Sequence, residues 1–264
     1  MVTMAFSVSV LVAAGENALM KHTPALCVAL GLGVPFTPFA RAQTNLYVGS
    51  NTPANTLDLT NGTNAYANTY VGYTVEASNN ALGVANAGTL LTNTNNLYVG
   101  YAGSGNSMTV ADGGVVANRQ GYIGFTNTAS NNSVLVTGGG STWTNTYALY
   151  VGYSGSSNNL VISTGGTVAA VYGYIGFTNT SSNNSVLVTG ADSLWTNRDS
   201  IYVGLLGNSN NLVISNGGAV AASDGGYIGA NADSFNNRVL VTGADSIWTN
   251  NFLYVGYEGS GNSL

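Results

Sequence analysis

The chain has 264 residues, of which only ten are Asp or Glu and five are Lys or Arg, for a net charge of −5. A charged fraction of 6%, against about 25% in ordinary soluble domains, argues against the surface of a typical cytosolic enzyme. At 45% apolar residues the chain is too hydrophobic for intrinsic disorder. It is also too acidic, and too poor in Lys and Arg clusters, for us to expect nucleic-acid binding.

The N-terminal segment, 1–42, differs from the rest of the chain. Lys21 precedes an apolar run at 25–36, which ends shortly before Ala40-Arg41-Ala42. A positive charge, a short apolar segment and an Ala-x-Ala site in this order are typical of a secretory signal peptide. We therefore expect an N-terminal extension followed by a signal peptide that starts at Met20 and is cleaved after Ala42, and an exported product. An uncleaved anchor is the alternative, but the run is shorter than the about 20 apolar residues that span a bilayer.

The remaining domain, residues 43–264, has few reactive side chains. Cys27, His22 and Lys21 all precede it, and its three arginines and nine carboxylates give a net charge of −6. This inventory excludes Ser–His and Cys–His nucleophiles, Schiff bases and imidazole metal centres. We predict no catalytic residue, no metal site and no cofactor. Without disulfides, packing and hydrogen bonds must supply the stability.

A short block with the pattern Tyr–Val/Ile–Gly recurs along this domain. Its glycines occupy nine positions, whose spacing alternates between a shorter and a longer step: 49, 72, 100, 124, 152, 176, 204, 229 and 256. The unit is about 26 residues long, within the range of roughly 20–50 residues that is typical of stacked repeats, and it is paired into a double unit of twice that length. A tyrosine stands two places before each glycine: Tyr47, Tyr70, Tyr98, Tyr122, Tyr150, Tyr174, Tyr202, Tyr227 and Tyr254.

A second marker has the same period. An asparagine closes a Ser-x-Asn or Ser-Asn-Asn triplet in successive units, before an apolar–x–apolar trio and a glycine turn: Asn80, Asn106, Asn132, Asn159, Asn184, Asn211, Asn237 and Asn262. One apolar position that follows in each unit is occupied alternately by Val and Trp: Val116, Trp143, Val168, Trp195, Val220 and Trp248. We expect the asparagines to stack and to hydrogen-bond from one unit to the next.

Each unit holds about three short β-branched or aromatic stretches separated by Gly, Asn and Ser, and the domain shows no helical periodicity. Such a unit cannot bury its own apolar face, but stacked units can. We predict an all-β fold, a parallel β-helix (β-solenoid) of about nine turns with about 26 residues each. A propeller is the architectural alternative because the double unit of about 52 residues is close to a kelch blade of about 50 residues, although the shorter period argues against it.

Alternation along a strand predicts how the Tyr–Val–Gly block faces. Val or Ile, and the residue after Gly, should point to the core, while the tyrosines point outward and stack beside a track of glycines. The opposite facing remains open, since period-2 arguments fail at solenoid corners. Exposed rings flanked by Asn and Thr can bind sugars, so our candidate glycan- or surface-binding residues are Tyr98, Tyr122, Tyr150, Tyr174, Tyr202, Tyr227 and Tyr254. The competing interpretation is that the stacked tyrosines only rigidify the rod.

The run of motifs Gly-Tyr-Ile-Gly, Ser-Asn-Asn-x-Val-x-Val-Thr-Gly, Ser-x-Trp-x-Asn and Leu-Tyr-Val-Gly-Tyr is clearest from Leu97 to Leu264. It resembles the repeat of bacterial autotransporter (type V secretion) passengers and of some PEP-CTERM-anchored surface proteins. The resemblance implies a β-helical region that is secreted or at the cell surface, with adhesive or structural roles. The chain stops within a unit, so we expect a fragment without a C-terminal cap, whose translocator barrel or surface anchor is missing from it and whose open end favours end-to-end self-association.

Two weaker candidates complete the inventory. Asp192 and Asp245 are equivalent and two turns apart, about 9.6 Å, near the upper limit for an inverting glycosidase. Both lie in Gly-Ala-Asp-Ser turns, where Asp is an ordinary turn residue, and Gly140 takes the same place in another unit. Asp112, Asp199, Asp224 and Asp233 are interpreted as solvated turn residues, because the calcium-binding nonapeptide of other solenoids is missing.

Thr-Asn-Thr occurs at 92–94, 126–128, 144–146 and 178–180, in two registers that skip turns, which argues against a continuous ice-binding array. We therefore expect a passenger segment that acts as an adhesive or structural stalk and is not an enzyme. Its partners would be glycans or the surface of a host or neighbouring cell. A polysaccharide-active enzyme and a purely architectural spacer are the alternatives.

Overall fold

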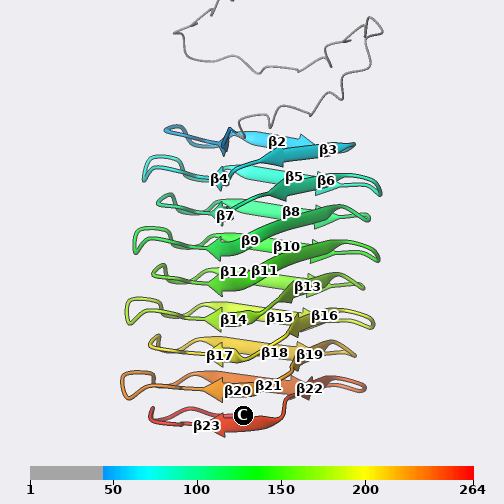
Figure 1. The fold of residues 1–264 in the computed structure, drawn as a ribbon. Helices are drawn as coiled ribbons and strands as arrows, with labels where there is room; N and C mark the ends of the chain where they lie inside the picture. The colour runs from blue at the N-terminus through cyan, green and yellow to red at the C-terminus, as the bar shows by residue number, and fades with distance from the viewer. Residues whose placement is uncertain (1–43) are drawn as a thin grey trace, which may run out of the picture. The chain divides into compact units, whose positions relative to one another are not determined.

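The computed structural model describes residues 44–264, so the signal peptide and the cleavage site expected in 1–42 lie outside the described residues. The described part is a parallel β-solenoid of about eight turns without a helix. Most turns contribute three strands, and consecutive turns lie one on the next along a common axis (Figure 1). This arrangement confirms the predicted fold class and excludes a propeller, in which the units would surround a hub.

One wall of the solenoid is an eight-stranded parallel sheet, here called sheet B. Its strands carry the apolar–x–apolar trios: β2 (Thr56–Leu59), β5 (Ala81–Ala85), β8 (Ser107–Ala111), β10 (Ser133–Thr137), β12 (Asn159–Ser163), β15 (Ser185–Thr189), β18 (Asn211–Ser215) and β21 (Arg238–Thr242). The register places like on like, for example Val134 on Leu160 and Val136 on Ile162. Since the buried side chains alternate with half-buried ones, this sheet faces the core on one side only.

The other wall is a 15-stranded sheet, sheet A, which bends between two segments. One segment contains the alternating Val or Trp position, which Asn64 and Leu91 occupy in the first two strands: β3 (Thr63–Tyr66), β6 (Leu90–Asn93), β13 (Thr167–Ala170), β16 (Leu194–Asn197), β19 (Ala219–Ala222) and β22 (Ile247–Thr249). The other segment carries the Tyr–Val–Gly block: β1 (Leu46–Val48), β4 (Thr69–Val71), β7 (Asn96–Val99), β14 (Tyr172–Ile175), β17 (Ile201–Val203), β20 (Gly225–Ile228) and β23 (Phe252–Val255). Two long strands run through both segments: β9 (Val115–Ile123) and β11 (Thr142–Val151).

The sequence expectation of nine turns counts one too many. Nine copies of the tyrosine block are present, but the ninth, in β23, begins a turn that sheet B does not complete with a strand. Only an isolated bridge between Arg238 and Ser263 continues sheet B there. The described solenoid therefore has about eight turns.

The core explains why the repeat is paired into double units. Trp143 and Trp195 are fully buried inside the solenoid, one turn after a glycine that precedes a tyrosine. A Cβ on Gly121 would lie 2.5 Å from the Trp143 ring, and one on Gly173 would lie 2.7 Å from the Trp195 ring. In the turns between, Leu149 fills the position that these glycines leave open. A tryptophan in one turn thus requires a glycine in the preceding turn, because the ring occupies the space of a side chain there.

The asparagine column is a continuous hydrogen-bond ladder, as predicted. The Asn158 side-chain Nδ2 donates to Asn184 Oδ1 at 3.1 Å, and the same oxygen accepts the Asn158 backbone N–H at 2.9 Å. Equivalent bonds join every turn from Asn55 to Asn262, so the ladder begins one turn earlier than the sequence marker does. In two turns the ladder uses the first asparagine of an Asn-Asn pair, Asn158 and Asn210, rather than Asn159 and Asn211. These amides satisfy the polar backbone at the corner of each turn.

Candidate functional site

The nine tyrosines of the repeat form one column, here called the inner tyrosine column. Neighbouring rings lie 4.7–5.5 Å apart with interplanar angles of 2–25°, so that each ring face is covered by the ring of the next turn. The column lies outside the main core, since its rings belong to a separate apolar cluster. The predicted facing of the tyrosines away from the core is therefore correct.

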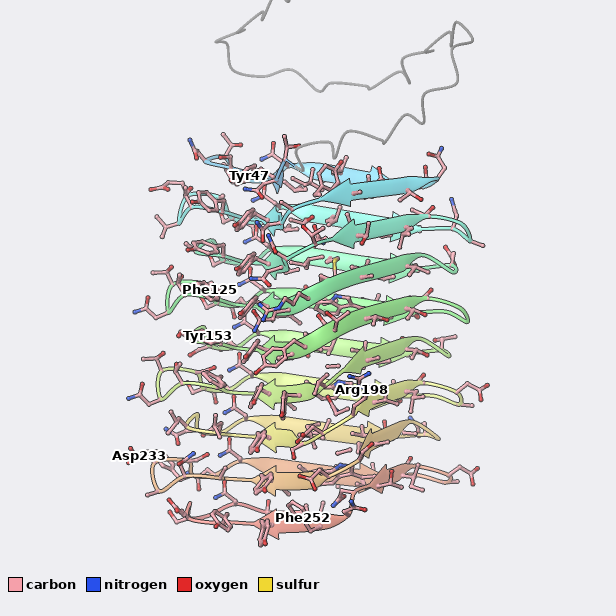
Figure 2. All side chains as sticks on the ribbon, viewed as in Figure 1. Tyr47, Phe125, Tyr153, Arg198, Asp233 and Phe252 are labelled. Atoms are coloured by element: carbon pink, nitrogen blue, oxygen red, sulfur yellow. The ribbon has the colours of Figure 1, made fainter. Side chains whose placement is uncertain are left out.

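A second, outer aromatic column covers the first. It consists of the residues after the repeat glycine, whose rings also stack at 4.9–5.2 Å: Tyr73, Tyr101, Phe125, Tyr153 and Phe177. Each stands edge-on against the inner column, as Tyr150 and Tyr153 do at 5.3 Å and 79°. Figure 2 shows Phe125 and Tyr153 on neighbouring turns, beside the loops.

The sequence expectation that these residues share the core side with Val or Ile is wrong. Strand alternation stops at the glycine, because Gly152 has φ +78° and this left-handed conformation turns the next side chain back toward the tyrosines. A side chain at Gly152 would also be blocked, since its Cβ would collide with the Asn184 amide of the ladder. The glycine is thus needed for the turn and for the ladder at once.

Because the outer column packs on the inner tyrosine column, little of each candidate tyrosine is left for a ligand to contact. Tyr98, Tyr122 and Tyr150 are only 7–8% exposed. Tyr174, Tyr202 and Tyr227 are half-buried, and Tyr254 in the last turn is 42% exposed. Ring faces in mid-column already pack on one another, so their edges and hydroxyls are what a ligand could reach. A binding role for these tyrosines remains a prediction.

Burial also changes the acidity of the column. Desolvation, reinforced by the neighbouring tyrosines, raises the pKa of Tyr70 and Tyr150 to about 12. Desolvation likewise raises the pKa of Tyr122 and Tyr174 above the ordinary value. These four tyrosines therefore resist ionisation when the solution becomes alkaline.

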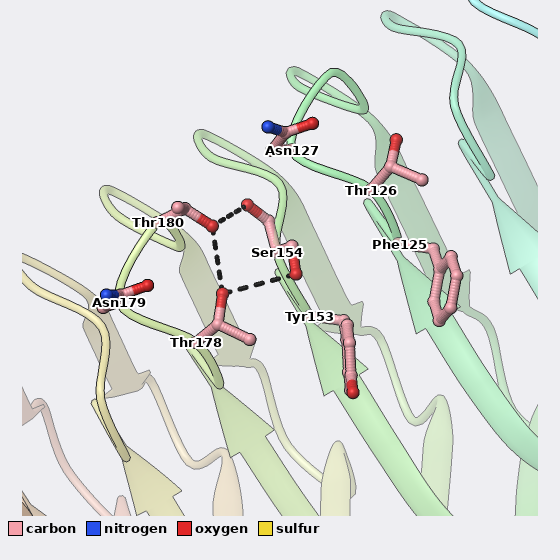
Figure 3. A pocket seen from close by; sticks show the side chains of 8 residues that line it. All are labelled: Phe125, Thr126, Asn127, Tyr153, Ser154, Thr178, Asn179 and Thr180. Carbon is pink, nitrogen blue, oxygen red and sulfur yellow. Dashed lines mark hydrogen bonds between the residues drawn. The ribbon is translucent and has the colours of Figure 1, made fainter.

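The loops beside the outer column alternate in length and create a groove. Longer loops at 124–132 and 176–184 flank a shorter loop at 152–158, and the longer loops protrude further on alternate turns (Figure 1). The space between them has a volume of about 470 Å³. Its lining residues are Phe125, Thr126, Asn127, Tyr153, Ser154, Thr178, Asn179 and Thr180 (Figure 3).

The groove presents neutral hydrogen-bonding groups on a rigid frame. Thr178 Oγ1 donates to Ser154 Oγ at 3.3 Å, and Thr180 Oγ1 donates to the Ser154 carbonyl at 2.9 Å, so the wall is fixed to the floor (Figure 3). The exposed amides of Asn127 and Asn179 stand on opposite walls. None of the lining side chains carries a charge. This combination of an aromatic edge, hydroxyls and amides suits a neutral, hydroxyl-rich ligand.

The Thr-Asn-Thr motifs at 126–128 and 178–180 form the walls of the groove. The motifs at 92–94 and 144–146 begin on sheet A, where Thr92 and Thr144 are both paired with Ala117. The two registers expected from the sequence are confirmed. What the sequence missed is the groove itself, although the alternation of longer and shorter loops is a visible signal for it. The aligned hydroxyls occur on alternate turns and form no continuous array.

The two carboxylates considered for glycoside hydrolysis lie in exposed turns. Asp192 and Asp245 are exposed, with φ of +63° and +60°, and Gly140 at the equivalent place has φ +82°. The residue type thus follows from a left-handed turn, which Asp and Gly tolerate. Within residues 44–264, no three His, Cys, Asp or Glu side chains gather closely enough to hold a metal ion. A search of the same residues finds no helix with the length and hydropathy needed to cross a membrane.

No protein-family model, no curated protein and no solved structure matches the chain.

Proposed function

We propose that the chain is an exported, cell-surface solenoid of autotransporter-passenger type, which acts as a stalk and adheres to neutral glycans through the groove around Tyr153. Support for the stalk comes from three ladders that run without interruption along the axis: the core, the Asn55–Asn262 amides and the inner tyrosine column. Each ladder couples every turn to the next, which resists bending and local opening.

The observation that carries the adhesive part is the uncharged lining of the groove. Hydroxyls of Thr126 and Thr178, amides of Asn127 and Asn179 and the ring of Tyr153 meet in one space. A sugar ring carries hydroxyls on its rim and apolar C–H groups on its faces, and therefore needs both hydrogen-bonding groups and an apolar contact. An acidic protein with a neutral groove favours uncharged sugars over uronic or sialic acids.

Binding of the purified protein to immobilised neutral and acidic polysaccharides tests this proposal. Ser154→Phe fills the floor of the groove and should abolish retention on neutral glycans. Ser223→Phe is the matched control, because Ser223 is an exposed serine that does not line the groove. Equal retention of both variants, or no retention of the wild type on any glycan, would leave the chain as a purely architectural spacer.

Tyr153→Phe tests the same site without disturbing the column. Phenylalanine already stands at the equivalent positions 125 and 177, so stacking is preserved, as the rings of Phe125 and Tyr153 lie 5.1 Å apart. Loss of one neutral hydrogen bond should weaken glycan binding roughly two- to tenfold with an unchanged melting temperature. Unchanged affinity would remove the Tyr153 hydroxyl from the binding site.

A further inference from the structure

The outward face of sheet B is a regular surface that consists of three columns of side chains. The central column contains Asp58, Gly83, Thr109, Leu135, Val161, Leu187, Val213 and Leu240. One flanking column contains Thr56, Ala81, Ser107, Ser133, Asn159, Ser185, Asn211 and Arg238. The other contains Ala85, Ala111, Thr137, Ser163, Thr189, Ser215 and Thr242.

The central column is apolar over five consecutive turns, from Leu135 to Leu240. Each of these side chains points away from the core and is half-buried only by its neighbours on the sheet. Polar but uncharged side chains border the stripe on both sides, and some are tied in pairs, as in the 3.0 Å bond from Ser163 Oγ to Thr137 Oγ1. An apolar centre with a neutral polar rim is the anatomy of a protein–protein interface.

Charge is confined to the two ends of this face. Asp58 lies on β2 at one end, where its carboxylate extends over Gly83, and Arg238 lies on β21 at the other. The six strands between them carry no charged side chain. The face is therefore electrically asymmetric along the solenoid axis, negative at β2 and positive at β21.

From this pattern we propose that sheet B is a self-association face on which a second copy of the chain packs in the antiparallel direction. A twofold axis along the strands places β2 of each copy opposite β21 of the other. Asp58 of one copy and Arg238 of the second then lie on opposed strands, two residues apart along the strand direction, and this pair occurs twice. A parallel arrangement would instead place the two Asp58 carboxylates opposite each other on β2 and would leave Arg238 without an opposed carboxylate. Leu135 of each copy then faces Val161 of the other across the axis, as the reciprocal contacts of an isologous interface require.

The size of the face is sufficient for such a dimer. Eight strands at ~4.8 Å and five residues at ~3.3 Å give roughly 600 Å² for each copy. The resulting ~1,200 Å² in total lies at the lower limit of specific interfaces, which fits a reversible dimer of moderate affinity. The proposal does not depend on glycan binding, because the groove lies on the loops and not on sheet B.

Sedimentation equilibrium of the purified protein over a range of concentrations tests the proposal. The wild type should show a monomer–dimer equilibrium, and Leu187→Lys should abolish dimerisation because it puts a charge into the apolar centre. Thr144→Lys, on an outward position of sheet A, is the control and should dimerise as the wild type does. If Leu187→Lys fails to fold, Leu187→Thr serves instead, since Thr109 already occupies this column.

A charge exchange tests the antiparallel direction. Asp58→Arg and Arg238→Asp should each weaken dimerisation several-fold, and the double variant should restore it, because the two opposed pairs are then only inverted. Failure of the double variant to recover would overturn the antiparallel arrangement. A monomer at every concentration, or open-ended growth that Leu187→Lys leaves unchanged, would overturn the whole proposal.

Discussion

Replacing Ala170 by Asn should stabilise the protein, because one turn of the solenoid already shows the hydrogen bonds that the change would create. Trp143 Nε1 donates to Asn118 Oδ1 at 2.8 Å, and Asn118 Nδ2 donates to Asn145 Oδ1 at 2.7 Å. Ala170 stands at the position equivalent to Asn118, one double unit further along the chain. The template for the substitution is thus contained in the molecule.

The turn around Ala170 leaves buried polar atoms without a partner. Trp195 Nε1 and both side-chain polar atoms of Asn197 are buried and make no hydrogen bond. Asparagine at 170 would accept from Trp195 and donate to Asn197, two bonds of about 1 kcal/mol each. After the cost of ordering the new side chain, we expect a gain of about 1–2 kcal/mol, which raises the melting temperature by roughly 2–8 °C for a chain of this size.

Thermal and urea unfolding, followed by circular dichroism, measure the effect. Ala170→Leu is the matched control, since it fills the same space but satisfies neither Trp195 nor Asn197, and it should bring no gain. The reverse change, Asn118→Ala, should cost about 2–6 kcal/mol because it orphans two buried groups. Equal stability of the Asn and Leu variants at 170 would refute the argument that polar satisfaction, rather than volume, limits this turn.

Three further predictions concern the ladders and the tyrosines. Asn158→Ala should lower the free energy of unfolding by about 3 kcal/mol in urea titrations. It leaves the buried backbone N–H and Nδ2 of Asn132 without an acceptor and removes one of the two hydrogen bonds that Asn184 Oδ1 accepts. Gly152→Ala should be severely destabilising, since it combines φ +78° with a collision between the new Cβ and the Asn184 amide, whereas Gly139→Ala meets nothing within 4 Å and should change the melting temperature little. The contribution of Tyr70 and Tyr150 to stability should be fully present below pH 10 and should be lost as the pH rises from 10 toward 12, because these tyrosines ionise near a pKa of 10 when unfolded but near 12 when folded. A single midpoint near pH 10 in the tyrosinate absorbance of the folded protein would contradict the pH prediction. Wild-type stability of Asn158→Ala or of Gly152→Ala would contradict the prediction for that variant.

Much of the candidate site depends on one local conformation. Strand alternation correctly placed Val151 in the core and Tyr150 outside it. The same rule placed Tyr153 on the wrong side, because alternation holds only while the backbone stays extended, and Gly152 is left-handed. A glycine in a sequence permits that conformation without requiring it. Here the neighbouring turn requires it, since the Asn184 amide occupies the space of a side chain at 152.

The amino-acid sequence alone determined the period, the parallel stack, the buried Val and Leu positions and the asparagine ladder. These features follow from repetition, because identical units that cannot bury their own apolar face must bury it against one another. Only the tertiary structure decided how far the tyrosines are covered, why Trp143 follows Gly121, and where alternating loops leave a groove. Those features depend on contacts between side chains of adjacent turns, and their distances are set by packing in three dimensions rather than by spacing along the chain.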